Sequence, residues 1–233
     1  MVRDLSLSGI AVFDRFAREY DQWFIENSFA YMSEVEAIRR YIPDSGLGVE
    51  VGAGTGRFSK PFGIRTGIEP SEEMARLAHS RGLFIIRALA EELPFADETI
   101  DYVLMVTVIC FLTDLPMAMN EVRRVLIPGG RLIIGFIDRE SHLGKRYESM
   151  KDSSRFYRGA RFYSVPHVMD ILTSSGFHDF QVCQTLFTNP KDMVRCDPVR
   201  EGYGEGGFVV LSGINSDSFI RLSPSLLYPY PPP

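Results

Sequence analysis

Cysteines are scarce in this sequence. The 233 residues include three, Cys110, Cys183 and Cys196, which are scattered and form no CxxC pair. This number and spacing argue against a disulfide framework and against a zinc site, because both need cysteines in sets. We therefore expect a protein of a reducing compartment that holds no metal ion.

A long apolar run and an excess of basic residues are also missing. No stretch approaches the roughly 18 uncharged apolar residues that a membrane-spanning helix needs, and the segment 1–16 is too polar for a secretory signal. The net charge is -5, so no dominant basic face for nucleic acid is expected. We predict a cytoplasmic protein that binds neither membranes nor nucleic acid.

Apolar and amphipathic segments alternate along most of the chain. Helical spacing of apolar residues and capping signals predict helices at 13–41, 71–82, 114–126 and 165–175, with further helical residues towards Lys60. Short apolar runs predict strands at 47–51, 65–68, 84–87, 100–108, 131–137, 180–187 and 208–214.

This alternation indicates the fold class. Strands that alternate with helices form parallel βαβ units with right-handed crossovers. The last two strands are instead joined by irregular residues without a convincing helix, which favours an antiparallel final pair. We predict an α/β fold: a doubly wound, Rossmann-like, seven-stranded sheet, mostly parallel, with an antiparallel last strand and helices on both faces.

The same segmentation predicts three regions. A helical cap is expected at 1–45 and a ligand-binding domain at 46–215. Two connections, 139–163 and 188–207, are expected to form the rim of its site. The end of the chain, 216–233, is rich in proline, and we expect it to be disordered.

A glycine-rich turn follows the first predicted strand. Glycines 52, 54 and 56 stand where the chain must turn sharply and its backbone can approach a ligand, which a Cβ would obstruct. The spacing is GxGxG, unlike the GxGxxG of dinucleotide sites, and Arg57 occupies the place of a third small residue. Glu50, just before the turn, would sit poorly beside a pyrophosphate and could instead hold a cation or a water. Taken alone, the pattern also fits an ordinary turn without a ligand.

Glu69 stands at the end of the second predicted strand, 17 residues after Gly52. A carboxylate at this position can accept hydrogen bonds from both hydroxyls of a ribose. Solvated acids are common at strand ends, so it is the pairing of Glu69 with the glycine-rich turn that indicates a nucleoside ligand.

Four segments match the motifs of one family in order and spacing. They are Val-Glu-Val-Gly-Ala-Gly-Thr-Gly-Arg at 49–57, Gly-Ile-Glu-Pro-Ser at 67–71 with Met74, Ala-Glu-Glu-Leu-Pro-Phe at 90–95 followed by 97–103, and Leu-Ile-Pro-Gly-Gly-Arg-Leu at 126–132. Together they resemble class I S-adenosylmethionine-dependent methyltransferases, particularly the small-molecule type 11 group. The resemblance covers about residues 45 to 137, and four ordered matches are more specific than one glycine pattern.

The resemblance implies a cofactor, S-adenosylmethionine, and a role for particular residues. Gly52 to Gly54 would pass beneath its methionine part, and Glu69 would bind its ribose. Adenine would lie at residues 89–90, and the end of the fourth strand would line the reaction zone. The predicted cofactor-binding residues are Glu50, Gly52, Ala53, Gly54, Glu69, Pro70, Leu89, Ala90, Val106 and Thr107.

The sequence departs from the family's patterns at two places. Many relatives have an acid at the position of Leu89, so adenine recognition is left to backbone groups and apolar contact. No Asn/Asp-Pro-Pro-Tyr/Phe sequence follows the fourth strand, which has Val-Thr-Val-Ile-Cys-Phe at 106–111 and so argues against methylation of adenine or glutamine amide groups. Cys110 could be a nucleophile, but a buried structural thiol is the favoured interpretation.

No motif identifies the methyl acceptor, which we expect to be a small molecule. Parallel topology places the rim segments 139–163 and 188–207 on the edge of the glycine-rich turn. The stretch 139–161 has a net charge of +4, which favours an anionic acceptor but also fits a solvated helical face. The candidate substrate residues are Tyr20, Trp23, Tyr163, Glu201, Tyr203 and Glu205. The last four of these are also candidates for a general base.

The predicted activity is in-line transfer of a methyl group from the cofactor to that acceptor. In such a reaction the enzyme mainly aligns the reactants and excludes water. Two alternatives stay open from the sequence: an NAD-dependent oxidoreductase, which the glycine spacing disfavours, and a non-catalytic cofactor-binding module of the same fold.

Overall fold

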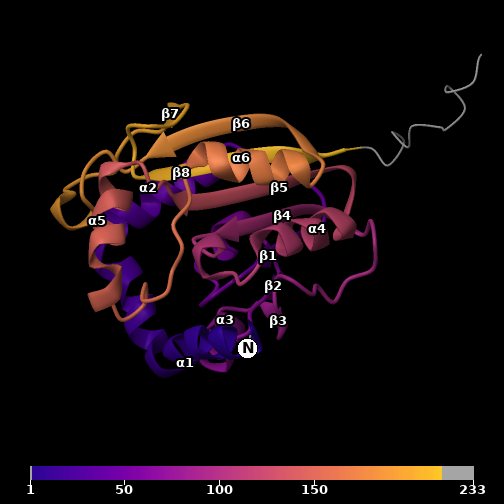
Figure 1. Ribbon diagram of the computed structural model, residues 1–233, viewed down its shortest axis with the longest axis horizontal. Coiled ribbons are helices and arrows are strands. Elements are labelled where there is room, and N and C mark those ends of the chain that lie inside the picture. The colour runs from indigo at the N-terminus through magenta and orange to yellow at the C-terminus, as the bar shows by residue number, and fades with distance from the viewer. Residues whose placement is uncertain (1, 217–233) are drawn as a thin grey trace, which may run out of the picture.

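A single mixed sheet with helices on both faces forms the centre of the computed structural model (Figure 1). The structure describes residues 2–216, with side chains from Ile10 onward, so the predicted tail at 217–233 lies outside the described residues. The strands are β1 Gly48–Val51, β2 Thr66–Ile68, β3 Phe84–Ile86, β4 Ile100–Val106, β5 Leu126–Ile137, β6 Phe177–Thr185, β7 Arg200–Glu201 and β8 Phe208–Asn215. The helices are α1 Val2–Glu26, α2 Ser28–Arg39, α3 Glu72–Ser80, α4 Leu115–Val125, α5 His142–Met150 and α6 Val165–Ser174, with short 3-10 helices η1 Lys60–Phe62, η2 Ile109–Phe111, η3 Lys151–Ser153 and η4 Pro190–Asp192.

The strand order is β3-β2-β1-β4-β5-β8-β6-β7. Strands β1 to β5 pair in parallel, whereas β8 is antiparallel to both of its neighbours, β5 and β6. The predicted doubly wound sheet with an antiparallel last strand is therefore confirmed. The prediction missed β7, which pairs with β6 at the sheet edge, because two residues are too short to show an alternating pattern.

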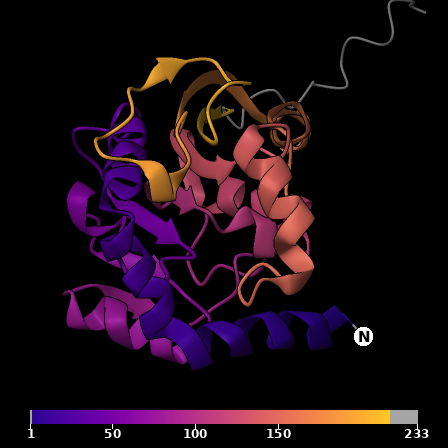
Figure 2. The same ribbon diagram turned by 90° about the vertical axis from the view of Figure 1, so that its left-hand side faces the viewer.

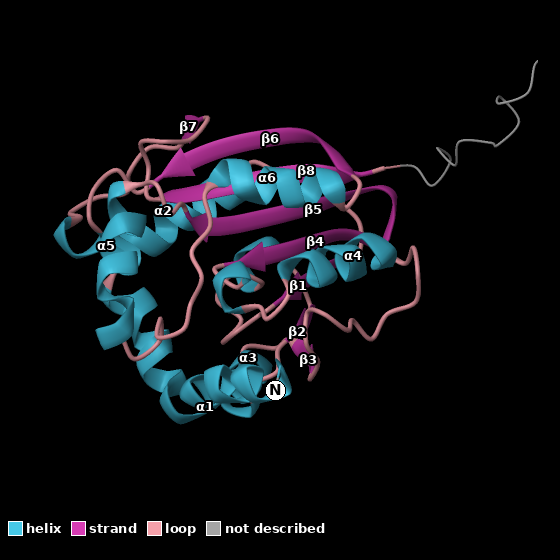
Figure 3. Cartoon of the chain, in the orientation of Figure 1, coloured by secondary structure: helices cyan, strands magenta, loops and turns pink. Residues whose placement is uncertain are grey.

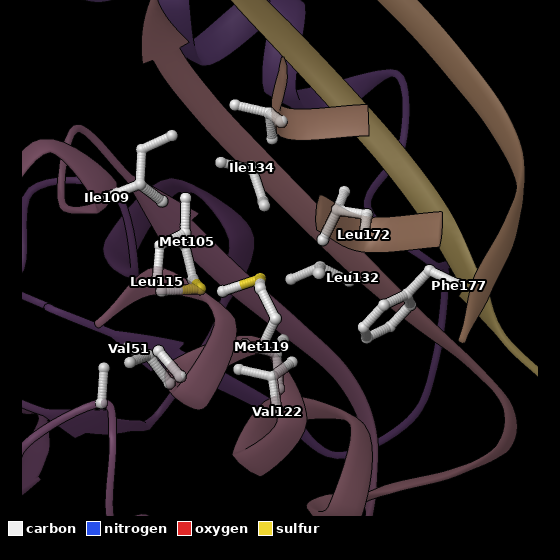
Figure 4. Close-up of a cluster of buried hydrophobic side chains, with 14 of the residues drawn as sticks. Val51, Met105, Ile109, Leu115, Met119, Val122, Leu132, Ile134, Leu172 and Phe177 are labelled. Carbon is white, nitrogen blue, oxygen red and sulfur yellow. The ribbon is translucent and has the colours of Figure 1, made fainter. Parts of the chain in front are cut away.

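The strands in the middle of the sheet are buried on both faces. Along β4, Val103 and Met105 contact the hydrophobic cluster beneath α4 and α6, whereas Leu104 and Val106 contact the cluster beneath α1 and α2. This alternation follows from the two-residue repeat of a strand, and its unbroken apolar sequence is typical of a parallel strand covered by helices. Figure 4 shows the first cluster, where Met105 meets Met119 of α4.

Local signals explain where the helices on these faces begin. Ser71 precedes α3, and its hydroxyl accepts a hydrogen bond from the Met74 amide at 3.2 Å. Asp114 does the same for the Met117 amide at 2.9 Å at the start of α4. The cap at Ser71 was expected from the sequence, whereas Asp114 was predicted as the first residue of its helix and instead caps it. Ser164 precedes α6 as predicted but makes no side-chain cap hydrogen bond.

The predicted N-terminal helix 13–41 is two helices. The chain is already helical from Val2, bends at Phe16, and breaks at Asn27 between α1 and α2. The Asn27 backbone amide and side chain both donate to the Trp23 carbonyl, at 2.8 and 2.9 Å, and the φ of -113° and ψ of 45° at Asn27 interrupt the helix. Asparagine side chains often bond to nearby backbone at helix ends, and apolar periodicity does not reveal this.

The helix expected towards Lys60 is also wrong. Residues 55–59 form turns, and the 3-10 helix η1 follows with Pro61 in its first turn. The sequence Thr55 to Ser59 does not continue as a helix because its polar side chains bond to α1 and β1 instead, as described below. Within the described residues, no long helix begins directly after the glycine-rich turn. The partial positive charge of a helix N-terminus is therefore absent there.

The carboxyl ends of the parallel strands lie together at one edge of the sheet, at the left of Figure 3 and facing the reader in Figure 2. The glycine-rich turn follows β1 there, Glu69 follows β2, and residues 107–111 follow β4. Helix α1 runs along this edge. No helix within residues 2–216 has both the length and the apolar character needed to cross a bilayer.

Candidate active site

The glycine-rich turn is tied to the neighbouring strand. The amides of Gly52 and Ala53 both donate to the Ile68 carbonyl, at 2.8 and 2.9 Å. Gly52 has φ +74° and Gly54 has φ +52°, a region that other residues rarely adopt. A Cβ at Gly52 would also lie 2.3 Å from a methyl group of Val108. The turn therefore requires glycine at these two positions for backbone reasons.

Glu69 closes the turn from the side of β2. It is 7 % exposed, and its two carboxylate oxygens accept hydrogen bonds from the amides of Gly54 at 2.8 Å and Ser71 at 2.9 Å. Burial raises the pKa of this carboxyl to about 7, although the two amides act in the opposite direction. Each oxygen keeps a further lone pair, so the carboxylate can still accept from the vicinal hydroxyls of a ribose. The arrangement fits a nucleoside bound along the glycine-rich turn.

Glu50 lies below the turn and is 1 % exposed. Its carboxylate accepts a hydrogen bond from the Ser59 hydroxyl, which ties β1 to the residues that precede η1. Burial raises the pKa of Glu50 to about 8, against the opposing effect of Ser59. The structure thus gives Glu50 a partner within the chain, and its predicted contact with the cofactor stays a prediction. No cluster of metal-ligating side chains occurs among the described residues.

Asp21 attaches α1 to the turn. Its carboxylate accepts hydrogen bonds from the Thr55 hydroxyl at 2.6 Å, from Arg57 at 2.6 and 2.9 Å and from Arg81 at 2.7 Å. Burial acts to raise the pKa of Asp21, but these donors lower it to about 2. Arg57, which the sequence showed in place of a small residue, therefore holds the helix that covers the turn.

Aromatic side chains of α1 form a roof next to the turn. The Tyr20 ring lies 4.0 Å from the position that a Cβ on Gly54 would occupy. Ring centroids place Tyr20 5.7 Å from Phe13 and 5.6 Å from Phe156, and Phe13 lies 5.0 Å from Phe111. The predicted substrate residue Tyr20 is thus brought to the glycine-rich turn, together with aromatic residues from η2 and from the segment 154–163.

The end of β4 lies under this roof. Val106 is buried, and Thr107 has φ +51°, which is strained for a β-branched residue. The Thr107 amide donates to the Gly135 carbonyl at 2.7 Å, and the Cys110 thiol donates to the Thr107 carbonyl at 3.6 Å. Burial raises the pKa of Cys110 to about 12, which disfavours a thiolate and agrees with the structural interpretation of this cysteine.

A small enclosed cavity of about 10 Å³ adjoins the end of β4. The predicted substrate residue Tyr163 is buried and contributes to its wall, stacked on His167 with ring centroids 5.6 Å apart. The cavity is lined by Thr107, Ile109, Cys110, Phe136, Ile137, Tyr157, Phe162 and Tyr163.

The predicted adenine end lies beyond β3. Ala90 is buried and Leu89 is 39 % exposed, so an apolar surface is accessible there. The Pro70 carbonyl, directly after Glu69, accepts a hydrogen bond from Arg87 at 3.0 Å. These residues follow β2 and β3 at the same edge as the turn.

Four predicted substrate residues do not join this arrangement. Trp23 packs edge-to-face on Phe24 within the second hydrophobic cluster. Glu201, Tyr203 and Glu205 are exposed on or beside β7, the outermost strand, four strands away from β4 in the sheet. Their surroundings are those of an outer edge, and Glu205 pairs with Arg200 at 2.9 Å.

Two acids near the candidate site, Asp21 and Glu34, were not predicted from the sequence. Asp21 gave no signal, because an acid on an amphipathic helix normally faces solvent. Glu34 is 3 % exposed and lies on α2 at helical spacing with the buried residues Ala30, Ala37 and Ile38. An acid within such an apolar stripe is a signal that could have found it.

The comparisons with known proteins agree with this site. The family model described as "Methyltransferase domain" matches residues 49–134, which run from the glycine-rich turn into β5. A crystal structure from Thermotoga maritima is described as a SAM-dependent methyltransferase and possible histamine N-methyltransferase. It is 48% identical, superposes with a TM-score of 0.87, and the match covers 88% of this chain and 99% of that one. The chain belongs to the class I S-adenosylmethionine-dependent methyltransferases of the type 11 group.

Two further relatives show how far the likeness extends. An uncharacterized protein of Methanocaldococcus jannaschii is 48% identical over 203 residues, which is 86% of this chain and 97% of the relative. Phosphoethanolamine N-methyltransferase 2 of Haemonchus contortus, solved with S-adenosylhomocysteine, is 16% identical with a TM-score of 0.63 and shares the fold. That match covers 88% of this chain and 58% of the other. The methyltransferase family model and the 48% identical T. maritima methyltransferase identify the cofactor as S-adenosylmethionine, and the oxidoreductase alternative is set aside.

Proposed function

We propose that this methyltransferase acts on a small molecule that is held at the end of β4, beneath α1. The observation that carries the proposal is the enclosed cavity between Thr107, Cys110 and the aromatic side chains of 157–163. It adjoins the residues that follow β4, and the rings of Tyr20 and Phe13 on α1 pack together beside Phe111 in that segment. S-adenosylmethionine supplies an activated methyl group, so the chain has mainly to align the acceptor and exclude water.

The N-terminal region supports this proposal as a cover for the site. We propose that 1–45 acts as the predicted cap, since Asp21 bonds it to the turn and Tyr20 lies beside Gly54. Segment 139–163 contributes Phe156, Tyr157 and Phe162 to the same zone. Segment 188–207 instead packs along α2, where the Asp197 amide donates to Ser33 at 3.0 Å.

An anionic acceptor has no further support from the geometry. All the cations of 139–161 except Lys151 are exposed, and Arg155 pairs with Glu19 on α1. The T. maritima relative, described as a possible histamine N-methyltransferase, favours a small acceptor. The predicted absence of nucleic-acid binding and the predicted location in the cytoplasm remain expectations of the same proposal.

The test is an assay of S-adenosylhomocysteine release with the full chain. The panel contains small amines including histamine, small alcohols, small carboxylates, transfer RNA, duplex DNA and an unfolded protein. We expect saturable release with at least one class of small molecule and none above background with the macromolecules. Methylation of a macromolecule, or cofactor binding without transfer to any compound, would contradict the proposal, and the second result would favour the non-catalytic module.

A further inference from the structure

Glu34 is a buried carboxyl group without a partner. It is 3 % exposed, and no side-chain hydrogen bond or ion pair of residues 10–216 involves its carboxylate. The Glu34 oxygens are not among the fully buried side-chain atoms without a partner, so they are not completely sealed from solvent. Burial alone raises the pKa of Glu34 to about 8, since neither a hydrogen bond nor a cation offsets the loss of hydration. Buried polar groups in native proteins are nearly always paired, so one without a partner needs an explanation such as a ligand.

The surroundings of Glu34 are tyrosines from several elements. Tyr20 on α1, Tyr31 on α2, Tyr147 on α5 and Tyr157 in the segment after η3 all pack against the second hydrophobic cluster, which includes Ala37 and Ile38 one turn after Glu34. Burial is the main cause that raises the pKa of these four phenols, and the charge of Glu34 adds to it. They come from two parts of the chain that are far apart in the sequence: α1 and α2 form one part, and α5 with the segment after η3 forms the other. We call these four residues, Tyr20, Tyr31, Tyr147 and Tyr157, the tyrosine wall. The Tyr31 phenol donates to the Arg57 carbonyl at 2.7 Å, so its ring face, not its hydroxyl, is free for a ligand.

The rings of this wall continue to the cavity at the end of β4. Tyr147 and Tyr157 stack with centroids 5.1 Å apart, and Phe162 lies 5.5 Å from Tyr157. Tyr157 also stacks on Phe111 at 5.9 Å, next to Cys110. Tyr157 and Phe162 both line the small cavity, so the cavity and the tyrosine wall share side chains. The cavity holds at most about one water molecule, so an acceptor would have to push one of these rings aside.

Tyr20 connects this zone to the cofactor site. Its ring lies beside Gly54, whose amide donates a hydrogen bond to Glu69 at 2.8 Å. An acceptor held between Glu34 and the end of β4 would thus face the place where the glycine-rich turn binds the methyl donor. Aromatic faces attract cations, and a carboxylate pairs with an ammonium group, so both parts of the zone suit the same kind of ligand.

We propose that the methyl acceptor is a small amine, and that Glu34 and the tyrosine wall bind its ammonium group. This rests on the proposed function, methylation of a small molecule at the end of β4. The ammonium group first gives one proton to the Glu34 carboxylate and becomes a neutral amine. Its lone pair then forms the new N–C bond as the C–S bond of the sulfonium breaks, and that electron pair goes to sulfur. The products are a methylated ammonium and neutral S-adenosylhomocysteine, so the positive charge passes from sulfur to nitrogen.

The experiment compares matched acceptors and matched variants. Benzylamine, benzyl alcohol and benzoate form one series, and ethanolamine, ethylene glycol and glycolate form a second. Release of S-adenosylhomocysteine is measured with wild type, Glu34→Gln, Glu34→Asp and the control Glu36→Gln, an exposed acid on the same helix. Binding of S-adenosylhomocysteine and melting temperature are measured for each variant to confirm folding and an intact cofactor site.

We expect turnover with amines only. Glu34→Gln should raise KM for the amine by about 100-fold, because a buried ion pair loses one partner, whereas Glu34→Asp should recover part of the loss. Affinity for S-adenosylhomocysteine should change by less than about two-fold, and Glu36→Gln should match wild type. Turnover of alcohols or carboxylates in preference to amines, or an unchanged KM in Glu34→Gln, would overturn the inference and leave the proposed function standing. No turnover of any small molecule would contradict both.

Discussion

Two acids of the N-terminal helices, Asp21 on α1 and Glu34 on α2, meet opposite environments, and we propose different roles for them. Asp21 receives hydrogen bonds from Thr55, Arg57 and Arg81, so its pKa lies at about 2 and it stays charged. Glu34 is buried without any donor. The charged acid holds the chain together, whereas the unpaired one is available to a ligand.

The Asp21→Asn substitution tests the first role. It leaves two arginines without a negative partner, and we expect the free energy of unfolding to fall by about 2 kcal/mol, since breaking a partly buried charge pair is costly. Affinity for S-adenosylhomocysteine should fall by about ten-fold, because α1 is held less firmly on the turn. Denaturant unfolding and calorimetry measure both effects.

Asp44→Asn, in an exposed loop, is the matched control and should behave like wild type. Equal stability of Asp21→Asn and Asp44→Asn would show that the network around Asp21 does not hold α1.

At the scale of elements, α1 is the part of the described chain whose stability should depend most on the cofactor. Its Tyr20 lies beside Gly54, and Asp14 caps α3 by accepting from the Glu73 amide at 3.2 Å. A ligand beneath α1 adds contacts to this helix, whereas α6 on the opposite face of the sheet gains none. We expect S-adenosylhomocysteine at saturation to slow amide exchange in residues 17–26 by about ten-fold or more, with little change in α6.

Hydrogen exchange followed by mass spectrometry measures this difference. Equal protection of both helices on binding would indicate a global stabilisation, and unchanged α1 would contradict its role as a cover.

The helices and strands differ in how far they can be predicted from the sequence. The buried strands and the turn after β1 were predictable because their apolar runs and glycines reflect local backbone requirements. The break at Asn27 and the missing helix after Gly56 were not. A local side-chain bond to the Trp23 carbonyl accompanies the first, and bonds of Thr55 and Ser59 to α1 and β1 accompany the second. The same difference holds within the site. A role for Glu69 can be predicted from its place at a strand end, whereas a role for Glu34 can be proposed only once the tertiary fold brings tyrosines around it.

For the whole molecule, the buried acids predict how stability depends on pH. Burial raises the pKa of Glu34 and Glu50 to about 8 and that of Glu69 to about 7. Groups whose pKa is raised on folding contribute stability that is present below their unfolded value, about 4.3, and lost as the pH rises through the folded value. Asp21 acts in the opposite sense, but only towards pH 2.

We therefore expect the melting temperature to fall between pH 6 and pH 9. Each of these acids can weaken stability by up to about 1.4 kcal/mol per pH unit between its unfolded and folded pKa values. Glu50→Gln should flatten the profile over this interval, and the exposed control Glu36→Gln should not. Calorimetric scans at constant ionic strength measure the profile, and a melting temperature that rises from pH 6 to pH 9 would contradict this account of the buried acids.

The central claim is that the glycine-rich turn and Glu69 together bind the methyl donor. Titration calorimetry with S-adenosylhomocysteine tests it most directly in wild type, Glu69→Ala, Gly54→Val and the control Glu36→Ala. We predict saturable binding to wild type and the control, and affinity lower by about 100-fold in Glu69→Ala, because a buried charged acceptor of ribose hydroxyls is lost. Gly54→Val should bind at least as weakly, because valine disfavours φ +52°. Wild-type affinity in Glu69→Ala, or no binding to wild type at millimolar ligand, would contradict the claim.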